Sequence, residues 1–597
     1  MLLGQFRRFI LQLPAGRRAL ALVWGAARGW TLAWGFLLVG QGLIPAGQAL
    51  LLRTMVNRLM RHPGWTSVAP PVLGIAALWI VAQVLSSLLS WVRAVQAECV
   101  QDRIYGLIHE QALRLDLAFY DHAESYDQLH RARVDALSQP LALLESLGSI
   151  VQNGLGFLVL AGILWTYAGW LPLLLVLTGV PGLLLVARHV LHENRWRQQN
   201  TSRERRSRYL DWLLTERSAA AELRIFELGD HHRKAFESVR RFLREGRLRL
   251  ERQGAVAELG AGSLAWAGSL TGLGWMLHRT LIGAVGLGDL LLCFQAFQQS
   301  QLQLRALLEG SGSIYRSLLF VENLDEFLKL EPQILAGSAE QTGLPLQDSI
   351  RFEGVDFSYP GSNHRALEGF DLEIPQGKVV ALVGHNGAGK STLIKLLCRF
   401  YDPDAGRILL DGVDLRGFDP AELRRNIAVL FQEPVHYHAT VRENIAFGDL
   451  EGLNDQERVL RAAEAAGALE PVERLSGGFE ALLGRWFGGA ELSGGEWQRI
   501  ALARAFFRKA ALVILDEPTS AMDSWAEQDW LGRFRTLTEG RTGLMITHRF
   551  TTAMHADMIH VLDKGRVIES GTHSQLVALG GTYAQSWAAQ MREISAH

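Results

Sequence analysis

Residues 384–391 form a glycine-rich segment whose residue types and spacing suit phosphate binding. They read Gly-His-Asn-Gly-Ala-Gly-Lys-Ser and match the pattern G-x-x-x-x-G-K-[ST] at every position. The glycines let backbone N–H groups converge on phosphate oxygens, and the helix-like run that follows directs its positive end to the same point. In this pattern Lys390 reaches the β- and γ-phosphates and the Ser391 hydroxyl lies on Mg²⁺. The segment therefore predicts a nucleoside triphosphate site, against the alternative of a glycine-rich turn that binds nothing.

Two adjacent carboxylates close an apolar stretch further along the chain. Residues 511–515 are all apolar, and Asp516 and Glu517 follow directly. A buried strand that ends in two acids is unusual unless the acids serve a metal and a water. We expect Asp516 to hold Mg²⁺, mostly through water, and Glu517 to polarise the attacking water. The alternative is that the acids only cap the next helix.

A second glycine-rich helix start lies between these two motifs. Residues 492–499 read Leu-Ser-Gly-Gly-Glu-Trp-Gln-Arg, so that Ser493, Gly494 and Gly495 would open a helix and form another anion site. One nucleotide does not need two such sites. With this motif the chain resembles an ATP-binding cassette (ABC) exporter half-transporter, and the resemblance covers essentially the whole chain. In that family the Leu-Ser-Gly-Gly signature of one cassette closes on the γ-phosphate held by the phosphate loop of another.

The resemblance implies roles for further residues. It implies that Tyr359 stacks on adenine, that Gln432 touches Mg²⁺ and the attacking water, and that His548 contacts the γ-phosphate. Asp523 belongs to a loop that links the two sites across the dimer. The implied catalytic set is Glu517, His548, Gln432 and Lys390, and the implied Mg²⁺ set is Ser391, Gln432 and Asp516. The implied ATP contacts are Tyr359, Gly384, His385, Asn386, Gly387, Ala388, Gly389, Lys390, Ser391, Thr392, Ser493, Gly494, Gly495 and Asp523.

The signature region departs from the usual family pattern in two places. Glu496 stands where the family usually has Gln, just outside the triplet that contacts phosphate. Residues 483–492 read Leu-Gly-Arg-Trp-Phe-Gly-Gly-Ala-Glu-Leu, where many exporters carry an acidic Gly-Glu-x-Gly segment. This form is similar to exporters of modified peptides such as lanthipeptides. The departure argues against the usual charged contact between this loop and the membrane helices, and the similarity points to a modified peptide as the substrate.

The elements before the soluble part are long and apolar. Six runs approach the roughly 20 apolar residues that a bilayer-spanning helix needs. They lie near 31–52, 70–91, 144–166, 168–190, 257–278 and 289–310. A set of buried soluble helices is the alternative, but the charge-free run 171–186 is hard to place in a soluble protein. The predicted fold class is multidomain: an all-α six-helix transmembrane domain with long cytoplasmic helical extensions, joined to an α/β P-loop ATPase domain.

The connections predict the topology. Sixteen Arg and Lys residues lie between Arg195 and Arg252, which favours the cytoplasm for this connection. The tips of the two long connections, near 117–125 and 219–226, are coupling helices by resemblance. We expect an interfacial amphipathic helix at 1–28, the membrane domain at 29–330, a linker at 331–348 and the cassette at 349–597. Both termini and the cassette are expected in the cytoplasm of a multi-pass protein of the plasma membrane, or of the inner membrane in a bacterium.

The composition of the chain limits the classes of partner that we expect it to bind. The net charge of −1 gives no sign of a nucleic-acid partner, and three scattered cysteines provide neither a disulfide framework nor a metal site. Amide side chains recur in the predicted spans: Gln41, Gln48, Gln83, Gln152, Asn153, Gln295, Gln298, Gln299, Gln301 and Gln303. They either line a path for amphipathic or peptide-like cargo or form hydrogen bonds between helices.

The predicted function is ATP-driven export by alternating access, with ATP and Mg²⁺ as cofactors and two composite ATP sites in a dimer. The expected partners are a second copy of the chain, membrane lipids and a small amphipathic or peptide cargo. A lipid flippase or multidrug exporter shares every motif and stays an alternative. So does one subunit of a heterodimeric exporter, although Glu517, His548 and the signature are all present and favour a homodimer.

Overall fold

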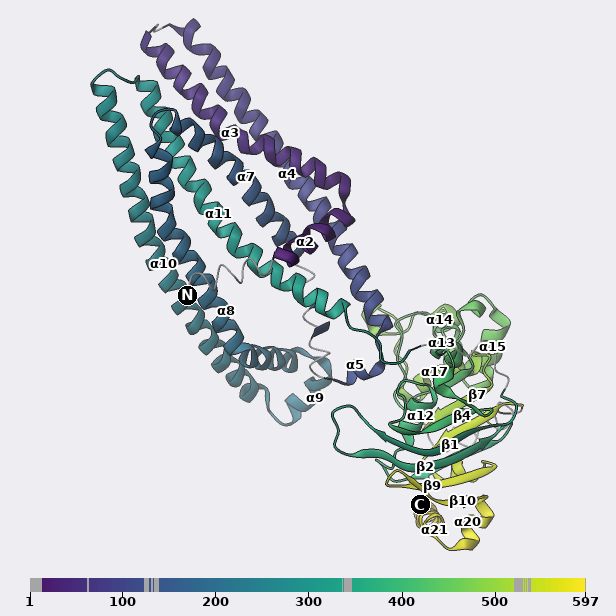
Figure 1. Cartoon of the computed structure of the whole chain (residues 1–597). Helices are drawn as coiled ribbons and strands as arrows, with labels where there is room; N and C mark the ends of the chain where they lie inside the picture. Colours follow the sequence, from purple (N-terminus) through teal and green to yellow (C-terminus); the bar gives the residue numbers. More distant parts are fainter. Residues whose placement is uncertain are drawn as a thin grey trace. The chain divides into compact units, whose positions relative to one another are not determined.

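The computed structural model describes residues 13–61, 64–122, 128–129, 132–133, 139–335, 337, 346–519, 530, 532, 534, 538 and 540–595. The chain divides into two compact units (Figure 1). One unit spans Met1–Leu113 with Asp127–Leu330, and the other spans Arg114–Tyr126 with Glu331–His597. We call the first the membrane unit and the second the cassette.

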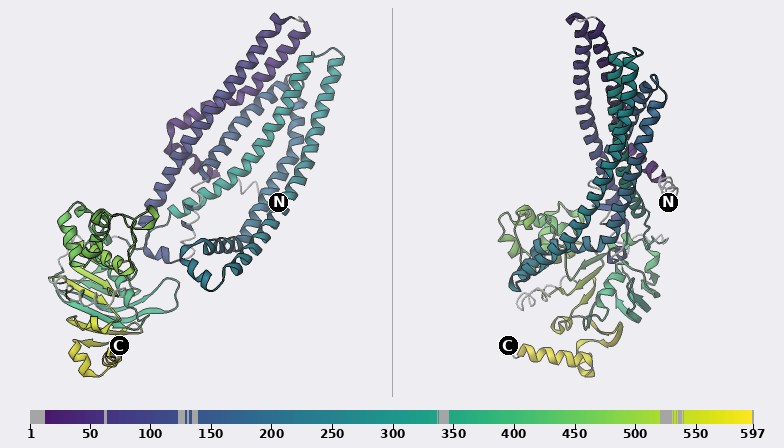
Figure 2. Two further views of the ribbon diagram at one scale, coloured as in Figure 1. Left: turned by 180° about the vertical axis from the view of Figure 1, so that it is seen from behind. Right: turned by 90° about the vertical axis from the view of Figure 1, so that its left-hand side faces the viewer.

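The membrane unit is built from long helices that run roughly side by side (Figures 1 and 2). They are α3 (Arg28–Arg61), α4 (Trp65–Arg114), α7 (Gln139–Trp165), α8 (Trp170–Thr215), α10 (Gly229–Leu281) and α11 (Leu287–Leu328), with α2 (Leu13–Ala26) before them and α9 (Arg217–Ile225) between α8 and α10. The six long helices cover the six predicted runs to within two residues. Within the described residues, α3, α4 and α7 are long and apolar enough to cross a membrane, and Trp170–Gly179 of α8 is a shorter apolar stretch.

The helices are much longer than a bilayer requires. The 50 residues of α4 and the 53 residues of α10 correspond to about 75–80 Å at 1.5 Å per residue. The hydrocarbon core of a membrane is about 30 Å thick. These helices therefore continue well beyond the bilayer, as the charge distribution along the sequence indicates.

Glycines allow the closest approaches between the membrane helices. Gly156 of α7 faces the backbone of Gly42 in α3 and the side chain of Gln303 in α11, and a Cβ atom at Gly156 would collide with that side chain. Gly148 of α7 lies against the Trp34 ring of α3 in the same way. Small residues commonly permit such contacts in membranes, where apolar surface alone does not drive helices together.

The cassette contains two sheets. The six-stranded sheet has the order β10-β9-β3-β8-β7-β6, and the four-stranded antiparallel sheet has the order β2-β1-β4-β5. The first consists of β3 (Val379–Gly384), β6 (Ile427–Leu430), β7 (Leu512–Asp516), β8 (Thr542–Ile546), β9 (Met558–Asp563) and β10 (Arg566–Gly571). The second consists of β1 (Ser349–Ser358), β2 (Arg365–Pro375), β4 (Ala405–Leu410) and β5 (Val413–Asp414).

Two apolar cores cover the two faces of the six-stranded sheet. Alternate residues of β3 enter different cores: Val379, Ala381 and Val383 join one, and Val380 and Leu382 join the other. This alternation follows from the period of two in a strand. Every residue of β7 and β8 is buried, which explains why these strands are almost continuously apolar in the sequence.

The helices of the cassette are mostly short. They are α12 (Lys390–Leu397), α13 (Pro420–Arg425), α14 (Val441–Ala446), α15 (Gln456–Ala465), α16 (Leu469–Glu473), α17 (Gly494–Phe507), α19 (Phe550–Ala553), α20 (His573–Leu579) and α21 (Thr582–Ser595), with 3₁₀ turns η1 (Leu415–Gly417), η2 (Leu450–Gly452), η3 (Gly478–Glu480) and η4 (Arg485–Phe487). Two of them, α12 and α17, begin at the two glycine-rich motifs.

The cassette also includes α5 (Leu117–Asp121), which lies at the predicted tip of the first long connection. Leu117 and Ala118 pack against the core formed by β1, β2 and α12. Asp116, which precedes the helix, accepts hydrogen bonds from the backbone N–H groups of Gln333 and Ile334 in the expected linker, the second at 3.1 Å. Residues 123–125 of the predicted tip lie outside the described residues. The predicted tip at 219–226 corresponds to α9 in the membrane unit.

Candidate nucleotide-binding site

The order of the strands brings three of the sequence motifs to one edge of the sheet. The strands β3, β8 and β7 are neighbours and parallel, so their carboxyl ends meet. β3 ends at Gly384, where the phosphate-binding segment begins, and β7 ends at Asp516. His548 follows β8 by two residues. In open sheets of this kind, ligands bind outside the carboxyl ends of the strands.

A cavity of about 810 Å³ opens at this edge. Of the predicted site residues, it is lined by Tyr359, Gly384, His385, Asn386, Gly387, Gly389, Lys390, Ser391, Thr392, Gln432, Asp516, Glu517 and His548. Its size lies within the range of small-molecule ligand sites. Phe550, Asp563, Ile568, Thr582 and Ser586 also line it. No motif in the sequence points to these five residues, because the fold brings α19, β9, β10 and α21 to the site from the end of the chain.

The phosphate-binding segment has the backbone that its glycines predict. Gly387 and Gly389 have φ values of 83° and 100°, in the left-handed region that favours glycine. A Cβ atom at Gly389 would collide with the Ala366 carbonyl group. Gly389 is the N-cap of α12, so the N-terminus of this helix faces the cavity.

Lys390 is buried at the base of the segment. Its Nζ donates to the carbonyl oxygens of Gly384 at 2.7 Å and His385 at 3.0 Å. Burial lowers the pKa of the Lys390 amine, while the carboxylates of Glu517 and Asp516 act in the opposite direction. The ammonium group is therefore held among backbone carbonyls next to two acids.

The predicted catalytic side chains converge on Glu517. Gln432 Nε2 lies 3.4 Å from one carboxylate oxygen of Glu517, and His548 Nδ1 lies 3.3 Å from the other. Ser391 Oγ donates to Asp516 Oδ2 at 3.3 Å. Burial, and after it the charge of Glu517, raise the pKa of Asp516 to about 6. The nearby charge of Lys390 acts against this rise in the pKa of Asp516.

Tyr359 is connected to α5, the predicted first coupling helix, by residues that the sequence analysis did not single out. Its hydroxyl group lies 3.1 Å from Thr392 Oγ1, and Lys395 Nζ lies 4.8 Å from its ring centroid. Lys395 also lies 3.7 Å from the carboxylate of Asp121 in α5, which accepts a hydrogen bond from the Tyr401 hydroxyl group. The position of Lys395, one helical turn after Ser391, is the one sequence signal that points to it.

The signature residues lie apart from the cavity of their own chain. Ser493, Gly494 and Gly495 are not among the residues that line it. Ser493 caps α17, and Glu496 Oε2 accepts hydrogen bonds from the Ser493 N–H at 2.8 Å and hydroxyl group at 2.9 Å. Asp523 lies outside the described residues, and Ala388 lies beside the cavity without lining it.

A side chain of the signature helix α17 nevertheless contacts the backbone of Glu517, the predicted catalytic residue. Gln498 is buried, and its Nε2 donates to the Glu517 carbonyl oxygen at 3.1 Å. Glu517 has a φ of 49°, which is uncommon for a residue with a side chain. Sequence reasoning missed Gln498, although it stands five residues after Ser493 in the signature itself.

The aromatic residues before the signature, where the sequence departs from the usual exporter pattern, form an exposed surface. The side chains of Trp486 and Phe487 are 84% and 69% exposed. The His438 ring stacks on Trp486, and the His436 ring stacks on Trp497 with centroids 4.4 Å apart. Two histidines after Gln432 therefore connect that segment to the 484–488 loop and to α17.

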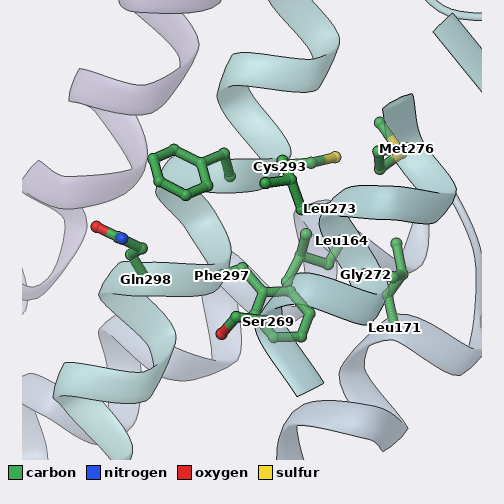
Figure 3. A pocket seen from close by; sticks show the side chains of 10 residues that line it. Leu164, Leu171, Ser269, Gly272, Leu273, Met276, Cys293, Phe297 and Gln298 are labelled. Atoms are coloured by element: carbon green, nitrogen blue, oxygen red, sulfur yellow. The ribbon is translucent and has the colours of Figure 1, made fainter. Parts of the chain in front are cut away.

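The amide residues of the membrane unit take different roles. Gln301 Nε2 donates to the Ala265 carbonyl at 2.7 Å and to Ser269 Oγ at 2.6 Å, which joins α11 to α10. By contrast, the buried Oε1 of Gln303 has no hydrogen-bond partner among the described residues. The cavity next to Ser269 (Figure 3) measures only about 10 Å³. A cavity of this size has room for about one water molecule.

Comparison with known proteins agrees with this fold and site. A family model described as "ABC transporter" matches residues 367–520. An ATP-dependent lipid A-core flippase from Aromatoleum aromaticum is 32% identical over 497 residues, which cover 82% of this chain and 81% of that relative. The chain therefore belongs to the ABC transporter family, as the resemblance of its motifs predicted.

Other relatives place it among the exporters. An ATP-dependent lipid A-core flippase from Chromohalobacter salexigens is 33% identical over 493 residues, 81% of this chain and 83% of the relative. The subtilin transport ATP-binding protein SpaT of Bacillus subtilis is 29% identical over 474 residues, 79% of this chain and 76% of the relative. A solved bacterial Atm1-family ABC exporter with ATP bound has the same fold, with a TM-score of 0.79 at 23% identity over 95% of this chain and 99% of that one.

These findings confirm the predicted fold class and the general activity. The chain is a multi-pass membrane protein that combines a helical membrane unit with an α/β ATPase cassette. It binds ATP, and it is an ATP-hydrolysing translocase of the exporter type.

Proposed function

We propose that two copies of this chain form an exporter with two composite ATP sites, and that ATP closes the two cassettes on each other. Each site would combine the phosphate-binding segment of one copy with the signature of its partner. Closure would switch the helices from an inward-facing to an outward-facing arrangement, and hydrolysis would reverse it. Such a cycle is a two-state switch that is biased by different affinities for ATP and its products.

The separation of the signature from the cavity carries this proposal. The cavity gathers the phosphate-binding segment, Gln432, Asp516, Glu517 and His548, but not Ser493–Gly495. The capped N-terminus of α17 is an anion-binding element in its own right. A second copy can supply it to the γ-phosphate side of the cavity.

The geometry supports distinct roles for the residues around Glu517. Glu517 would accept a hydrogen bond from the attacking water and orient it, and Gln432 and His548, at 3.4 and 3.3 Å, would hold the carboxylate in place. Lys390 would turn from its backbone carbonyls to the phosphates and neutralise their charge. Tyr359 would stack on the adenine ring.

The side chains next to the phosphate-binding segment fit a magnesium ion that is coordinated partly by the protein and partly by the phosphates of the nucleotide. Ser391 Oγ and Asp516 Oδ2 lie 3.3 Å apart and offer the hard oxygen atoms that Mg²⁺ prefers. Among the described residues there is no group of three or more His, Cys, Asp or Glu that could hold a metal alone. Ser391, Gln432 and Asp516 would therefore hold Mg²⁺ together with phosphate oxygens. When bound, Mg²⁺ would compensate the charge of the phosphates and of Asp516.

Two proposals for the exported cargo have support from the membrane unit and from the names of the relatives. Export of an amphipathic or peptide-like molecule agrees with the amide side chains of α11 and with a relative named for subtilin transport. The relatives named as lipid A-core flippases support the lipid alternative. In either case, peptide exporter or lipid flippase, we propose that the cassette and both termini lie in the cytoplasm. The protein would then be located in the plasma membrane, or in the inner membrane of a bacterium.

The Glu517→Gln variant tests the ATP-driven closure. We expect it to bind ATP and Mg²⁺ but to hydrolyse ATP at least about 100-fold more slowly, because it lacks the group that orients water. It should trap two ATP molecules per dimer, measured by retention of labelled ATP after gel filtration. Glu433→Gln is the matched control, since Glu433 is an exposed acid outside the cavity. Cassettes that stay apart in the Glu517→Gln variant with ATP and Mg²⁺ would refute the proposal.

Stimulation of ATP hydrolysis tests the cargo. The chain in nanodiscs is expected to hydrolyse ATP faster with cationic amphipathic peptides than with added lipid A-type glycolipid. The reverse order would favour the flippase alternative. A chain that purifies alone as an active dimer, of about twice the 66.2 kDa of one copy, would exclude an obligate heterodimer.

A further inference from the structure

A second cavity lies within the membrane unit, between α2, α4 and α11. It measures about 330 Å³. Its apolar wall includes Leu22 from α2, Leu107 from α4, and Val321 and Leu324 from α11. This cavity is separate from the ATP site, which belongs to the cassette.

The polar residues of this cavity leave an excess of positive charge. Arg18 forms an ion pair with Asp325, and Nζ of Lys329, which lies outside the lining of the cavity, is 2.6 Å from the same carboxylate. Arg103 also lines the cavity, and its side chain has no ion pair or hydrogen bond with any described residue. One carboxylate is thus shared by two cations while a third cation faces an apolar wall.

The surroundings place this cavity near the membrane surface. Gln96 of α4 donates to Thr31 Oγ1 of α3 at 2.9 Å, and Thr31 begins the first predicted span. Arg103 lies seven residues beyond Gln96, about 10 Å further along α4 on the side that leads away from the predicted span at 70–91. The side chains of Leu20 and Trp24 on α2 are 54% and 44% exposed, as in helices that lie in a membrane interface.

We propose that this cavity binds an acidic phospholipid from the membrane leaflet around it. The phosphate would lie between Arg103 and Arg18, and an acyl chain would cover Leu22, Leu107 and Leu324. A zwitterionic lipid would offer no net charge to Arg103. A soluble anion would leave the apolar wall uncovered. The bound lipid would fasten α2 to the ends of α4 and α11, next to the cytoplasmic extensions of the helices.

Lipid binding to the purified full-length chain tests this site. The detergent-solubilised protein is titrated with phosphatidylglycerol or phosphatidylcholine, and bound lipid is counted by native mass spectrometry. We expect tighter binding of the first phosphatidylglycerol than of phosphatidylcholine. Arg103→Gln should weaken the phosphatidylglycerol affinity about fivefold, the effect of one basic residue at an anionic surface. Arg103→Lys, which keeps the charge, should stay within about twofold of the unmodified chain.

Two controls distinguish lipid binding at this site from nonspecific electrostatic attraction between acidic lipids and the basic surface of the protein. Arg244→Gln removes the same charge from an exposed position on α10, outside the cavity, and should leave the affinity unchanged. Millimolar inorganic phosphate should not displace the lipid. The proposal is overturned if Arg103→Gln binds phosphatidylglycerol like the unmodified chain, if Arg244→Gln loses as much affinity, or if phosphate displaces the lipid. An unchanged thermal unfolding midpoint verifies that Arg103→Gln is folded.

Discussion

Glu496 places a negative charge at the N-terminus of α17, where the γ-phosphate of a partner's ATP is proposed to bind. Burial alone would raise the pKa of Glu496, but hydrogen bonds from Ser493 and the charge of Arg474 bring it below its ordinary value. The carboxylate is therefore ionised and competes with phosphate for the Ser493 hydroxyl group. The exporter pattern has Gln at this position, which can form the same capping contact without the charge.

We predict that Glu496→Gln strengthens ATP-driven closure. Removing one charge near a helix N-terminus changes the free energy of a nearby anion by about 0.3–1 kcal/mol, so the KM for ATP should fall roughly two- to fivefold. The steady-state ATPase rate as a function of ATP concentration measures this. Glu496→Ala separates charge from hydrogen bonding, because it also removes the carboxylate that accepts hydrogen bonds from the Ser493 N–H and hydroxyl groups and should destabilise the cassette by about 1 kcal/mol. A higher KM for ATP in Glu496→Gln would contradict the idea that the Glu496 carboxylate competes with phosphate for the Ser493 hydroxyl group.

His560 makes the stability of the cassette dependent on pH. It is buried on β9, its Nδ1 lies 2.7 Å from Ser570 Oγ, and burial lowers its pKa to about 4. Because the folded pKa is below the unfolded value, this contribution to stability is present above pH 6.5 and is lost as the pH falls toward 4. At pH 5 the loss should be about 2 kcal/mol.

Thermal unfolding of the full chain at pH 7.5 and pH 5 tests the role of His560. We expect His560→Gln to be less stable at pH 7.5 but to lose less stability than the unmodified chain at pH 5, because position 560 no longer takes up a proton. His364→Gln changes an exposed histidine and should keep the original pH dependence. Equal pH dependence in His560→Gln and the unmodified chain would show that other groups dominate.

At the scale of elements, the sequence predicted the features that are determined by residues close together in the chain. The strand, glycine loop and helix from Val379 to Leu397 follow from apolar burial and glycine spacing, and they formed as expected. The resemblance predicted that the segment 117–125 docks on a cassette, but the sequence could not show which residues make the contact, because they lie about 280 positions apart, as Asp121 and Tyr401 do. Nor could it show that Gln498 donates a hydrogen bond to the Glu517 carbonyl, since these residues meet only because α17 and β7 contribute to the same apolar core.

The contacts of α5 predict a coupling role for Asp121. Its carboxylate accepts from Tyr401 and lies 3.7 Å from Lys395, which in turn lies beside the Tyr359 ring. Asp121→Asn should change stability by less than about 1 kcal/mol, because these side chains are partly exposed. It should raise the ATP concentration needed to move the membrane helices by about fivefold or more, the scale of a typical coupling energy.

Spin labels at the exposed position of Trp65, at the start of α4, can report this movement in a dimer. The distance between the two labels is measured against ATP concentration in the Glu517→Gln background. Tyr401→Phe keeps the ring but removes the hydrogen bond to Asp121, so it should show a smaller shift in the same direction. An identical midpoint in Asp121→Asn would mean that this contact does not transmit ATP binding.

At the scale of the whole molecule, two copies with different defects distinguish a composite site from a self-contained one. In a hybrid of Lys390→Ala and Ser493→Arg chains, a composite arrangement leaves one site with both an intact phosphate loop and an intact signature. Each homodimer of these variants has a defect in both sites. We predict that the hybrid, isolated with two different tags, keeps up to about half of the normal ATPase rate, while each homodimer falls at least about 100-fold.

The same two substitutions in one chain, paired with an unmodified chain, give the opposite expectation. If the signature acts on the partner's ATP, both sites of this second hybrid are defective and it should be inactive. If each chain completed its own site, the unmodified chain would stay active here and the first hybrid would be inactive. Both hybrids contain identical numbers of substitutions, so differences in folding or expression affect them equally. An active second hybrid with an inactive first would disprove the shared site, and with it the proposed way in which ATP binding drives the helices.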